Sequence, residues 1–150
     1  ILFMGKTLSG KYRPTNPDKY AGDVGNIIYR SSWERTFCRW CDKTDEVLAW
    51  KSEENRIRYY DPIAKKNRIY FPDFWIKYKR KDGIIVEELV EVKPQRQIDG
   101  PPTHPKRRTQ SWLREVQTYV TNMAKWKAAA EYAEGRGWNF RLIAESNLGL

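Results

Sequence analysis

Two stretches of the chain repeat their apolar side chains with the spacing of an α-helix. Behind Ser31 and Ser32, either of which can cap a helix, apolar residues recur at i, i+4, i+7 and i+8: Trp33, Phe37, Trp40 and Cys41. A second, longer apolar face is made of Trp112, Leu113, Val116, Tyr119, Val120, Met123, Trp126 and Ala130. The pattern predicts two helices, the second ending at the glycines of residues 135–137.

Other segments have the composition of β-strands. Residues 47–53, 57–60, 67–78 and 84–92 are rich in β-branched and aromatic residues, and residues 79–83 between the last two are a turn signal. Residues 138–144 alternate polar and apolar side chains and predict a last strand. The resulting order α-β-β-β-β-α-β is typical of an α/β fold in which helices flank a mixed central sheet.

Two segments lack such periodicity. The first 26 residues contain prolines and glycines at irregular spacing, so we expect an N-terminal arm at 1–26, without a core element, before a domain at 27–150. Residues 94–108 combine several prolines with basic side chains. We expect no helix there because of the prolines, and no core because of the charges.

The charge of the chain favours a polyanionic partner. Its 28 Lys and Arg residues outnumber 19 Asp and Glu residues, a formal net charge of +9. No apolar run approaches the roughly 20 residues of a membrane span, so we expect no membrane partner. Cys38, Cys41 and the single histidine, His104, fall short of the about four ligands of a closed zinc site. Two buried thiols on the first helix are the better interpretation.

Candidate chemistry lies on the two strands around residues 67–78 and 84–92. Asp73 follows Phe71 and Pro72, and Glu91-Val92-Lys93 ends the later strand among apolar neighbours. Singly, an Asp after Pro and a Glu-x-Lys are ordinary turn and surface features. Together, carboxylates in apolar surroundings are costly without a compensating cation.

A divalent cation explains these residue types. Mg²⁺ takes oxygen ligands, usually one or two carboxylates, and keeps its other positions for water and phosphate. In phosphodiester hydrolysis such an ion neutralises developing charge and lowers the pKa of the attacking water. Lys93 would position that water and stabilise the charge on phosphorus.

The register of the two strands decides whether the carboxylates can meet. Glu91 and Lys93 are two residues apart and share one strand face. Folding the pair about Asp82 sets Asp73 opposite Glu91, with Cβ atoms about 5 Å apart. A two-residue turn at Asp82-Gly83 would send the carboxylates to opposite faces. The site therefore requires an odd-length loop or a bulge.

At these residues the chain resembles the PD-(D/E)xK nuclease superfamily, which has the restriction-endonuclease-like fold. Residues 29–35 resemble the opening helix of the transposon-encoded endonuclease subunits, and residues 57–60, 70–74 and 90–94 follow that group's pattern in order. The resemblance implies acidic site residues at Glu34, Asp73 and Glu91, and the site lysine at Lys93. Glu34 also forms a capping box with Ser31, so both of its roles stay open.

From about residue 4 onward, the chain also resembles the small head completion nucleases of T-even-type bacteriophages. This implies an endonuclease that uses Mg²⁺ or Mn²⁺, held by Asp73, Glu91 and the Val92 carbonyl, with Glu34 assisting directly or through water. Double-stranded DNA is the expected partner, with phage head or portal proteins as further partners, in the host cell cytoplasm or with the virion. Two alternatives stay open: a head assembly protein that binds without cutting, and a transposase- or resolvase-type nuclease that needs a partner subunit.

The chain has no evident DNA-reading motif, so we expect phosphate contacts rather than base recognition. The main candidates lie in the loop that leaves the strand of Lys93: Arg96, Lys106, Arg107 and Arg108. The basic turn at 79–81 is a weaker candidate, because it lies at the far end of the strands. A merely solvated loop is an equal interpretation. Base stacking stays open for Tyr59, Tyr60 and Trp75.

Overall fold

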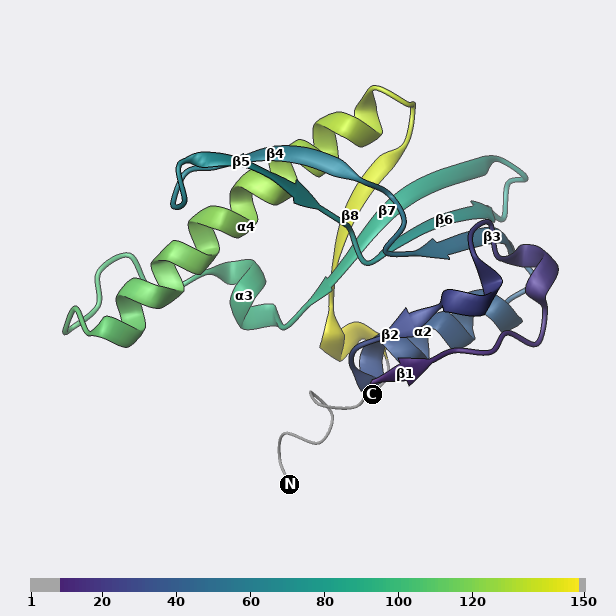
Figure 1. Ribbon diagram of the computed structural model, residues 1–150, viewed down its shortest axis with the longest axis horizontal. Coiled ribbons are helices and arrows are strands. Elements are labelled where there is room, and N and C mark those ends of the chain that lie inside the picture. Colours follow the sequence, from purple (N-terminus) through teal and green to yellow (C-terminus); the bar gives the residue numbers. More distant parts are fainter. Residues whose placement is uncertain (1–8, 149–150) are drawn as a thin grey trace.

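The computed structural model describes residues 9–148. Its centre is a four-stranded sheet in the order β3-β6-β7-β8, made of Val47–Ser52, Phe74–Lys79, Ile85–Lys93 and Asn139–Ala144 (Figure 1). Strands β3, β6 and β7 pair antiparallel, whereas β8 joins β7 in parallel. The predicted α/β fold, a mixed central sheet flanked by helices, is confirmed.

One face of the sheet is covered by α2, which spans Ser32–Lys43. The Ser31 side chain caps this helix by accepting a hydrogen bond from the Glu34 N–H at 3.2 Å. The inner side of α2 is apolar, and its Phe37 ring lies 4.5 Å from the ring of Phe74 on β6. Cys38 and Cys41 are both buried free thiols on this helix, as predicted.

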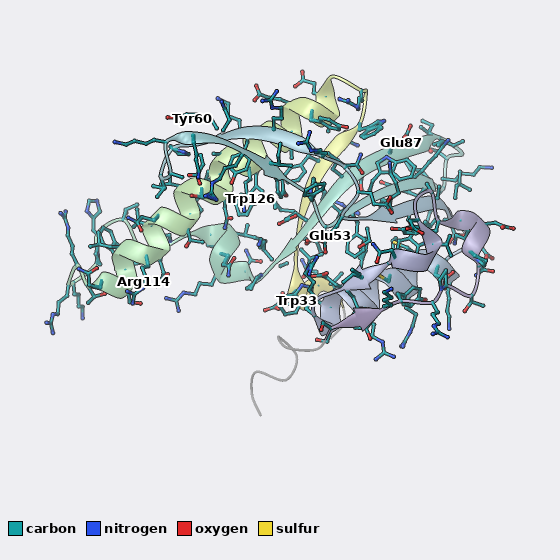
Figure 2. The ribbon with its side chains drawn as sticks, in the orientation of Figure 1. Trp33, Glu53, Tyr60, Glu87, Arg114 and Trp126 are labelled. Carbon is teal, nitrogen blue, oxygen red and sulfur yellow. The ribbon has the colours of Figure 1, made fainter. Side chains whose placement is uncertain are left out.

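The other face is covered by α4, which spans Gln110–Glu134, and by a hairpin of β4 (Ile57–Asp61) and β5 (Lys66–Tyr70). Trp126, Ala129 and Ala133 are buried there, and Figure 2 shows Trp126 on the side of α4 that faces the hairpin. Neither α4 nor any other helix within residues 9–148 combines the length and apolarity that crossing a membrane requires.

The predicted apolar face of α4 is buried over only part of its length. Leu113 is 41% exposed and Met123 is 47% exposed. The first half of α4, which carries Arg114, projects beyond the edge of the central sheet (Figures 1 and 2). No sheet lies under that half to cover its apolar side chains.

The strand predicted over residues 67–78 is two strands, because the chain leaves one sheet and enters another at residues 71–73. Strand β5 pairs with β4, whereas β6 pairs with β3 and β7. Pro72 lies at the break, where it has no N–H to donate to a ladder. Asp73 consequently stands at the very beginning of β6 rather than in the middle of a long strand.

The prediction that residues 94–108 contain no helix is wrong for five of them. Helix α3 spans Gln95–Asp99. Pro94 lies at its N-cap, where a missing N–H costs nothing, and Gly100 ends it with a φ of +82°. The remaining prolines follow the helix and do not interrupt it.

The segment predicted as an arm is packed onto the domain in its described part. Strand β1 (Gly10–Lys11) pairs with β2 (Ile28–Tyr29), and short 3₁₀ helices lie at Pro17–Lys19, Val24–Asn26 and Glu145–Leu148. Tyr20 is buried, with its ring 4.7 Å from that of Trp50. The prediction that this segment holds no core element is therefore wrong at Tyr20. Residues 1–8 lie outside the described residues, and the boundary at residue 26 stays a prediction.

Candidate active site

The β6–β7 register brings Asp73 and Glu91 to the same place. Phe74 pairs with Val90 and Lys79 with Ile85, so one step beyond the ladder Asp73 faces Glu91. The connection at residues 80–84 has the odd length that this register requires, and the Arg80 N–H closes it by donating to the Ile84 carbonyl at 2.8 Å. The predicted opposition of the two carboxylates is confirmed.

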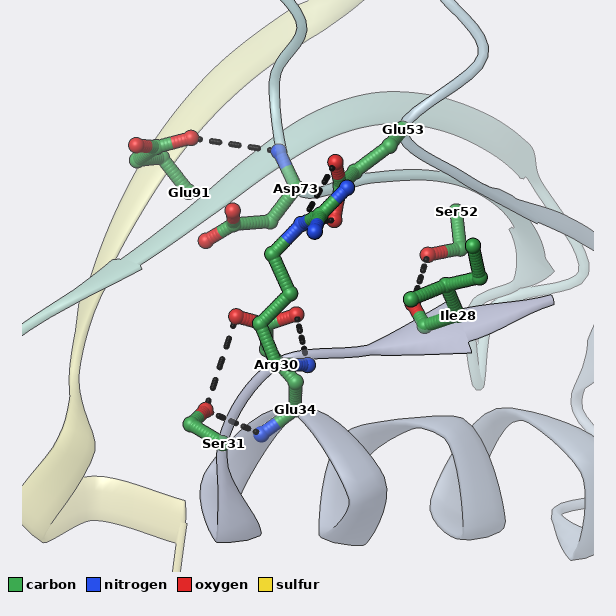
Figure 3. A network of polar contacts seen from close by, with 8 residues as sticks. All are labelled: Ile28, Arg30, Ser31, Glu34, Ser52, Glu53, Asp73 and Glu91. Carbon is green, nitrogen blue, oxygen red and sulfur yellow. Dashed lines mark hydrogen bonds and ion pairs between the residues drawn. The ribbon is translucent and has the colours of Figure 1, made fainter. Parts of the chain in front are cut away.

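Hydrogen bonds hold the two carboxylates in place. The Asp73 N–H donates to Glu91 Oε1 at 3.1 Å (Figure 3). The Val92 N–H donates to Asp73 Oδ2 at 2.8 Å. The buried Tyr70 hydroxyl, at the end of β5, donates to Glu91 Oε1 at 2.8 Å. Each carboxylate is thus oriented by the backbone of the strand opposite.

The electrostatics of this pair are unfavourable for two negative charges. Burial raises the pKa of Asp73 well above its usual value, and the charge of Glu91 raises it further. Burial also raises the pKa of Glu91. The charge of Lys93, whose Nζ lies 3.6 Å from Glu91 Oε2, lowers that pKa and so opposes the effect of burial. One lysine therefore does not compensate both carboxylates, and the pair favours a proton or a further cation.

Glu34 bonds the start of its own helix and also lies near the carboxylate pair. Its N–H donates to the Ser31 hydroxyl at 3.2 Å, and its Oε2 accepts from the N–H of Arg30 at 3.1 Å, one residue before the N-cap, so only the Ser31 half of the predicted capping box is formed. Burial raises the pKa of Glu34, and the charges of Glu53 and Glu91 add to this. Figure 3 shows the carboxylate of Glu34 pointing from the start of α2 toward Asp73. A capping residue is thus also an acidic neighbour of the pair.

The donor atoms around Asp73 fit a cation that needs few protein ligands. Within residues 9–148, no group of three or more His, Cys, Asp or Glu side chains is arranged to hold a metal ion. Mg²⁺ commonly uses one or two carboxylates and leaves the rest to water and phosphate. The Val92 N–H points at Asp73, and the carbonyl of a strand residue points to the same side as its N–H. Asp73, Glu91 and the Val92 carbonyl fit such an ion, whereas Glu34 does not fit as a third direct carboxylate ligand.

The predicted DNA-contacting residues are not brought to the carboxylates. Arg96 lies on α3 and forms an ion pair with Glu115 of α4 at 2.8 Å. Lys106, Arg107 and Arg108 are exposed in the loop before α4. Because a helix rises 1.5 Å per residue, the first residue of α4, Gln110, lies about 22 Å along the helix from Lys125, the residue of this helix next to the site, and Arg108 precedes that end. These basic residues could contact DNA only at a distance from the carboxylates.

Sequence reasoning missed several neighbours of the pair. Tyr70 stands three residues before Asp73, a local signal that the sequence contained. Lys125 of α4 is close enough to Lys93 and Glu91 for their charges to shift its pKa. Glu53, with a positive φ of 53°, donates its N–H to the Asp73 carbonyl at 3.0 Å and binds Arg30. No local pattern marks Lys125 or Glu53.

Burial also decides which aromatic residues can stack on bases. Tyr59 is 7% exposed and Trp75 is 8% exposed, so neither can receive a base. Tyr60 is 55% exposed on the outer side of β4. The stacking role considered for all three therefore stays open for Tyr60 alone.

Fold, site and sequence together define a nuclease of a known class. The family model described as "TnsA-like endonuclease N terminal" matches residues 44–145, a range that contains Asp73, Glu91 and Lys93. The chain belongs to this family. It is also 40% identical over 144 residues to the head completion nuclease of Enterobacteria phage T4, covering 93% of each chain. No solved structure matches the chain significantly. Both resemblances drawn from the sequence are confirmed.

Proposed function

We propose that this protein is an endonuclease that uses Mg²⁺ or Mn²⁺ to hydrolyse phosphodiester bonds of double-stranded DNA. The observation that carries the proposal is the opposition of Asp73 and Glu91 across β6 and β7, with Lys93 3.6 Å from Glu91. Membership of the endonuclease family supports the same chemistry.

Each residue of the site has a proposed role. Asp73, Glu91 and the Val92 carbonyl would hold the cation, which when bound neutralises charge on the phosphate and lowers the pKa of the attacking water. Lys93 shares a strand face with Glu91 and would direct its ammonium at the water and the phosphate oxygens. Glu34 would act through water, because both of its oxygens are already hydrogen-bonded, to the Arg30 N–H and the Ser31 hydroxyl.

The whole-chain relationship suggests where this activity is used. The phage T4 relative is named a head completion nuclease, and 93% of each chain takes part in the match. We therefore propose that this protein acts in phage head completion after DNA packaging, in the host cell cytoplasm or on the virion. Head or portal proteins would be its protein partners.

A plasmid-nicking assay with Mg²⁺, Mn²⁺ and EDTA tests the activity. Asp73→Asn and Lys93→Met should each lower the cleavage rate at least about a hundredfold, since each removes charge that acts on the reacting phosphate. The matched control is Glu87→Gln, which removes a carboxylate from the same face of β7. Glu87 stands opposite Lys77, away from the site.

Three outcomes would count against the proposal as stated. Wild-type cleavage by both site variants would show that the carboxylate pair does not carry the reaction. DNA binding without nicking in any of the metals would favour a head assembly protein that keeps the nuclease fold without cutting. Cleavage restricted to branched DNA, or dependent on a second protein, would favour the resolvase- or transposase-type alternative.

A further inference from the structure

Lys125 is a half-buried cation without a partner in the described part of the chain. Its Nζ lies 5.7 Å from the centre of the Tyr70 ring and 6.0 Å from the centre of the Tyr59 ring. Within residues 9–148, the ammonium makes neither a hydrogen bond to a protein acceptor nor an ion pair with a carboxylate. The two tyrosine rings hold it in place without neutralising it.

The carboxylates near Lys125 already have other partners. Glu91 accepts hydrogen bonds from Tyr70 and Asp73 and pairs with Lys93. Asp61 accepts from the N–H groups of Ile63 and Ala64, and its Oδ2 lies 3.7 Å from Arg68 Nε. Both carboxylates are thus engaged by other donors, and within residues 9–148 neither forms a contact ion pair with Lys125.

Two further cations stand close to Lys125. Burial lowers the pKa of Lys125 and the charge of Lys93 lowers it further, whereas the charges of Glu91 and Asp61 raise it and that of Arg68 lowers it more weakly. A half-buried ammonium beside other cations costs free energy, which an anion entering from outside would recover. The surroundings of Lys125 are thus those of an anion-binding residue.

The position of Lys125 relates this anion to the carboxylate pair. The Tyr70 ring under the ammonium belongs to the same side chain whose hydroxyl orients Glu91. Lys93 lies two residues after Glu91 on the same strand face. Its charge lowers the pKa of Lys125 more than that of Arg68 does. Phosphates recur about every 3.4 Å of helix axis along each DNA strand. The phosphate next to the reacting one is therefore a second negative charge close to the site.

We propose that Lys125, together with Lys93, forms a phosphate-binding subsite that holds a DNA backbone phosphate next to the one being cleaved. This deepens the proposed nuclease function and rests on it for the identity of the ligand. In this arrangement Lys125 binds substrate and sets its register on the enzyme, whereas Lys93 acts on the reacting phosphate.

A purely structural role predicts the opposite behaviour on substitution. If the lysine side chain only covered the tyrosine rings, a variant with an apolar side chain of similar length would bind DNA with wild-type affinity. Removing an uncompensated buried charge should also leave the thermal stability unchanged or improve it. Loss of DNA affinity together with preserved or higher Tm is therefore the signature of a binding residue.

The variants are Lys125→Met, which keeps the length of the side chain, and Lys125→Arg, which keeps its charge. Lys127→Met is the matched control, because Lys127 lies two residues further on the same helix, is exposed, and loses the same charge. The probe is a fluorescent duplex of about 20 base pairs, nearly two helical turns. Its binding is followed by anisotropy in EDTA at several salt concentrations, beside Tm for each variant.

Lys125→Met should weaken binding about tenfold and flatten the log–log salt slope by about one unit, with Tm equal to wild type or higher. Lys125→Arg should keep most of the affinity, and Lys127→Met should change it less than about twofold. In cleavage assays, Lys125→Met should raise KM more than it lowers kcat.

Wild-type affinity and slope for Lys125→Met would overturn the proposal. So would a loss of affinity that accompanies a lowered Tm and is not rescued by Lys125→Arg, since that pattern describes a damaged fold. Because binding in EDTA requires neither metal nor cleavage, failure of the nuclease proposal would show as inactive wild-type protein with the subsite behaviour unchanged. The two proposals therefore fail in distinguishable ways.

Discussion

Two aspartates on opposite sides of the central sheet, Asp42 and Asp73, have opposite electrostatic environments. On the α2 face, Asp42 is fully buried and accepts hydrogen bonds from the Tyr12 hydroxyl and from the N–H groups of Thr15 and Asn16. On the α4 face, Asp73 accepts one hydrogen bond and stands opposite another carboxylate. Lys125 of the same face has no carboxylate partner within residues 9–148.

The pKa shifts follow this difference. Burial opposes ionisation of Asp42, but its hydrogen bonds, above all that from Thr15, bring the pKa below its usual value. Burial and Glu91 raise the pKa of Asp73 instead. The Asp42 site thus satisfies its charge internally and serves the fold, whereas the Asp73 site leaves charges to be satisfied by a ligand.

The largest effect should come from breaking the internally satisfied side. Asp42→Ala leaves two part-buried backbone N–H groups and a tyrosine hydroxyl without their acceptor, so we expect a loss of about 3 kcal/mol in the free energy of unfolding. Urea unfolding measures this, with the exposed Asp45→Ala as the control. A loss equal to that of the control would show that the hydrogen bonds of Asp42 contribute no stability.

The pH dependence of Asp42 has a definite sign. A depressed pKa contributes stability above the unfolded value of about 4, and this stability is lost as pH falls through the folded pKa. The difference between wild type and Asp42→Asn should therefore be full at pH 7 and shrink in strong acid. A difference that stays constant down to pH 2 would contradict this.

The exposed end of the α4 side offers the next test. Neutralising Lys106, Arg107 and Arg108 together should flatten the log–log salt slope of DNA binding by up to about three units, equally for unrelated sequences. Because these residues precede the start of α4, which lies about 22 Å along the helix from Lys125, a duplex of a few base pairs held at the carboxylates should be insensitive to them. Neutralising the basic turn at residues 79–81 is the control. An unchanged salt slope for the variant at residues 106–108 would show that this loop is a solvated connector that does not contact DNA.

A smaller effect should follow from loosening the carboxylate pair. Tyr70→Phe removes the hydroxyl that orients Glu91, and we expect cleavage to fall about tenfold, the value of one hydrogen bond to a charged group. Tyr59→Phe, on the same face of the hairpin, is the control. Equal rates for both variants would mean that Asp73 and Lys93 orient Glu91 sufficiently.

The smallest effect, and the one of opposite sign, concerns the stability of Asp73→Asn. A raised pKa penalises the folded protein when the carboxylate is ionised, and the penalty disappears as pH falls to the unfolded value of about 4. The variant should therefore gain about 1 kcal/mol at pH 7, or 2–4 °C in Tm, and this gain should fade in acid. A loss of stability at pH 7 would show that the hydrogen bond to Val92 outweighs the repulsion from Glu91.

The sequence by itself determined those features that depend on neighbours along the chain. A serine cap at residue 31 or 32 and both long helices follow from side-chain spacing. The sequence left the turn open between a two-residue turn at Asp82-Gly83 and an odd-length connection, of which only the second lets Asp73 meet Glu91. The candidate residues were therefore predictable, whereas the structure decided the register that brings them together.

Only the tertiary structure decided which distant residues meet this pair. Residues 67–78 have strand composition throughout, yet they split at Pro72 because β5 and β6 find different partners. Tyr20 reaches the core through contacts that its irregular surroundings do not encode locally. Lys125 approaches Glu91 because α4 packs across the β4–β5 hairpin, and no spacing within the helix distinguishes it from Lys127. Such contacts depend on how whole elements pack, since burial and charge compensation are settled between elements and not within them.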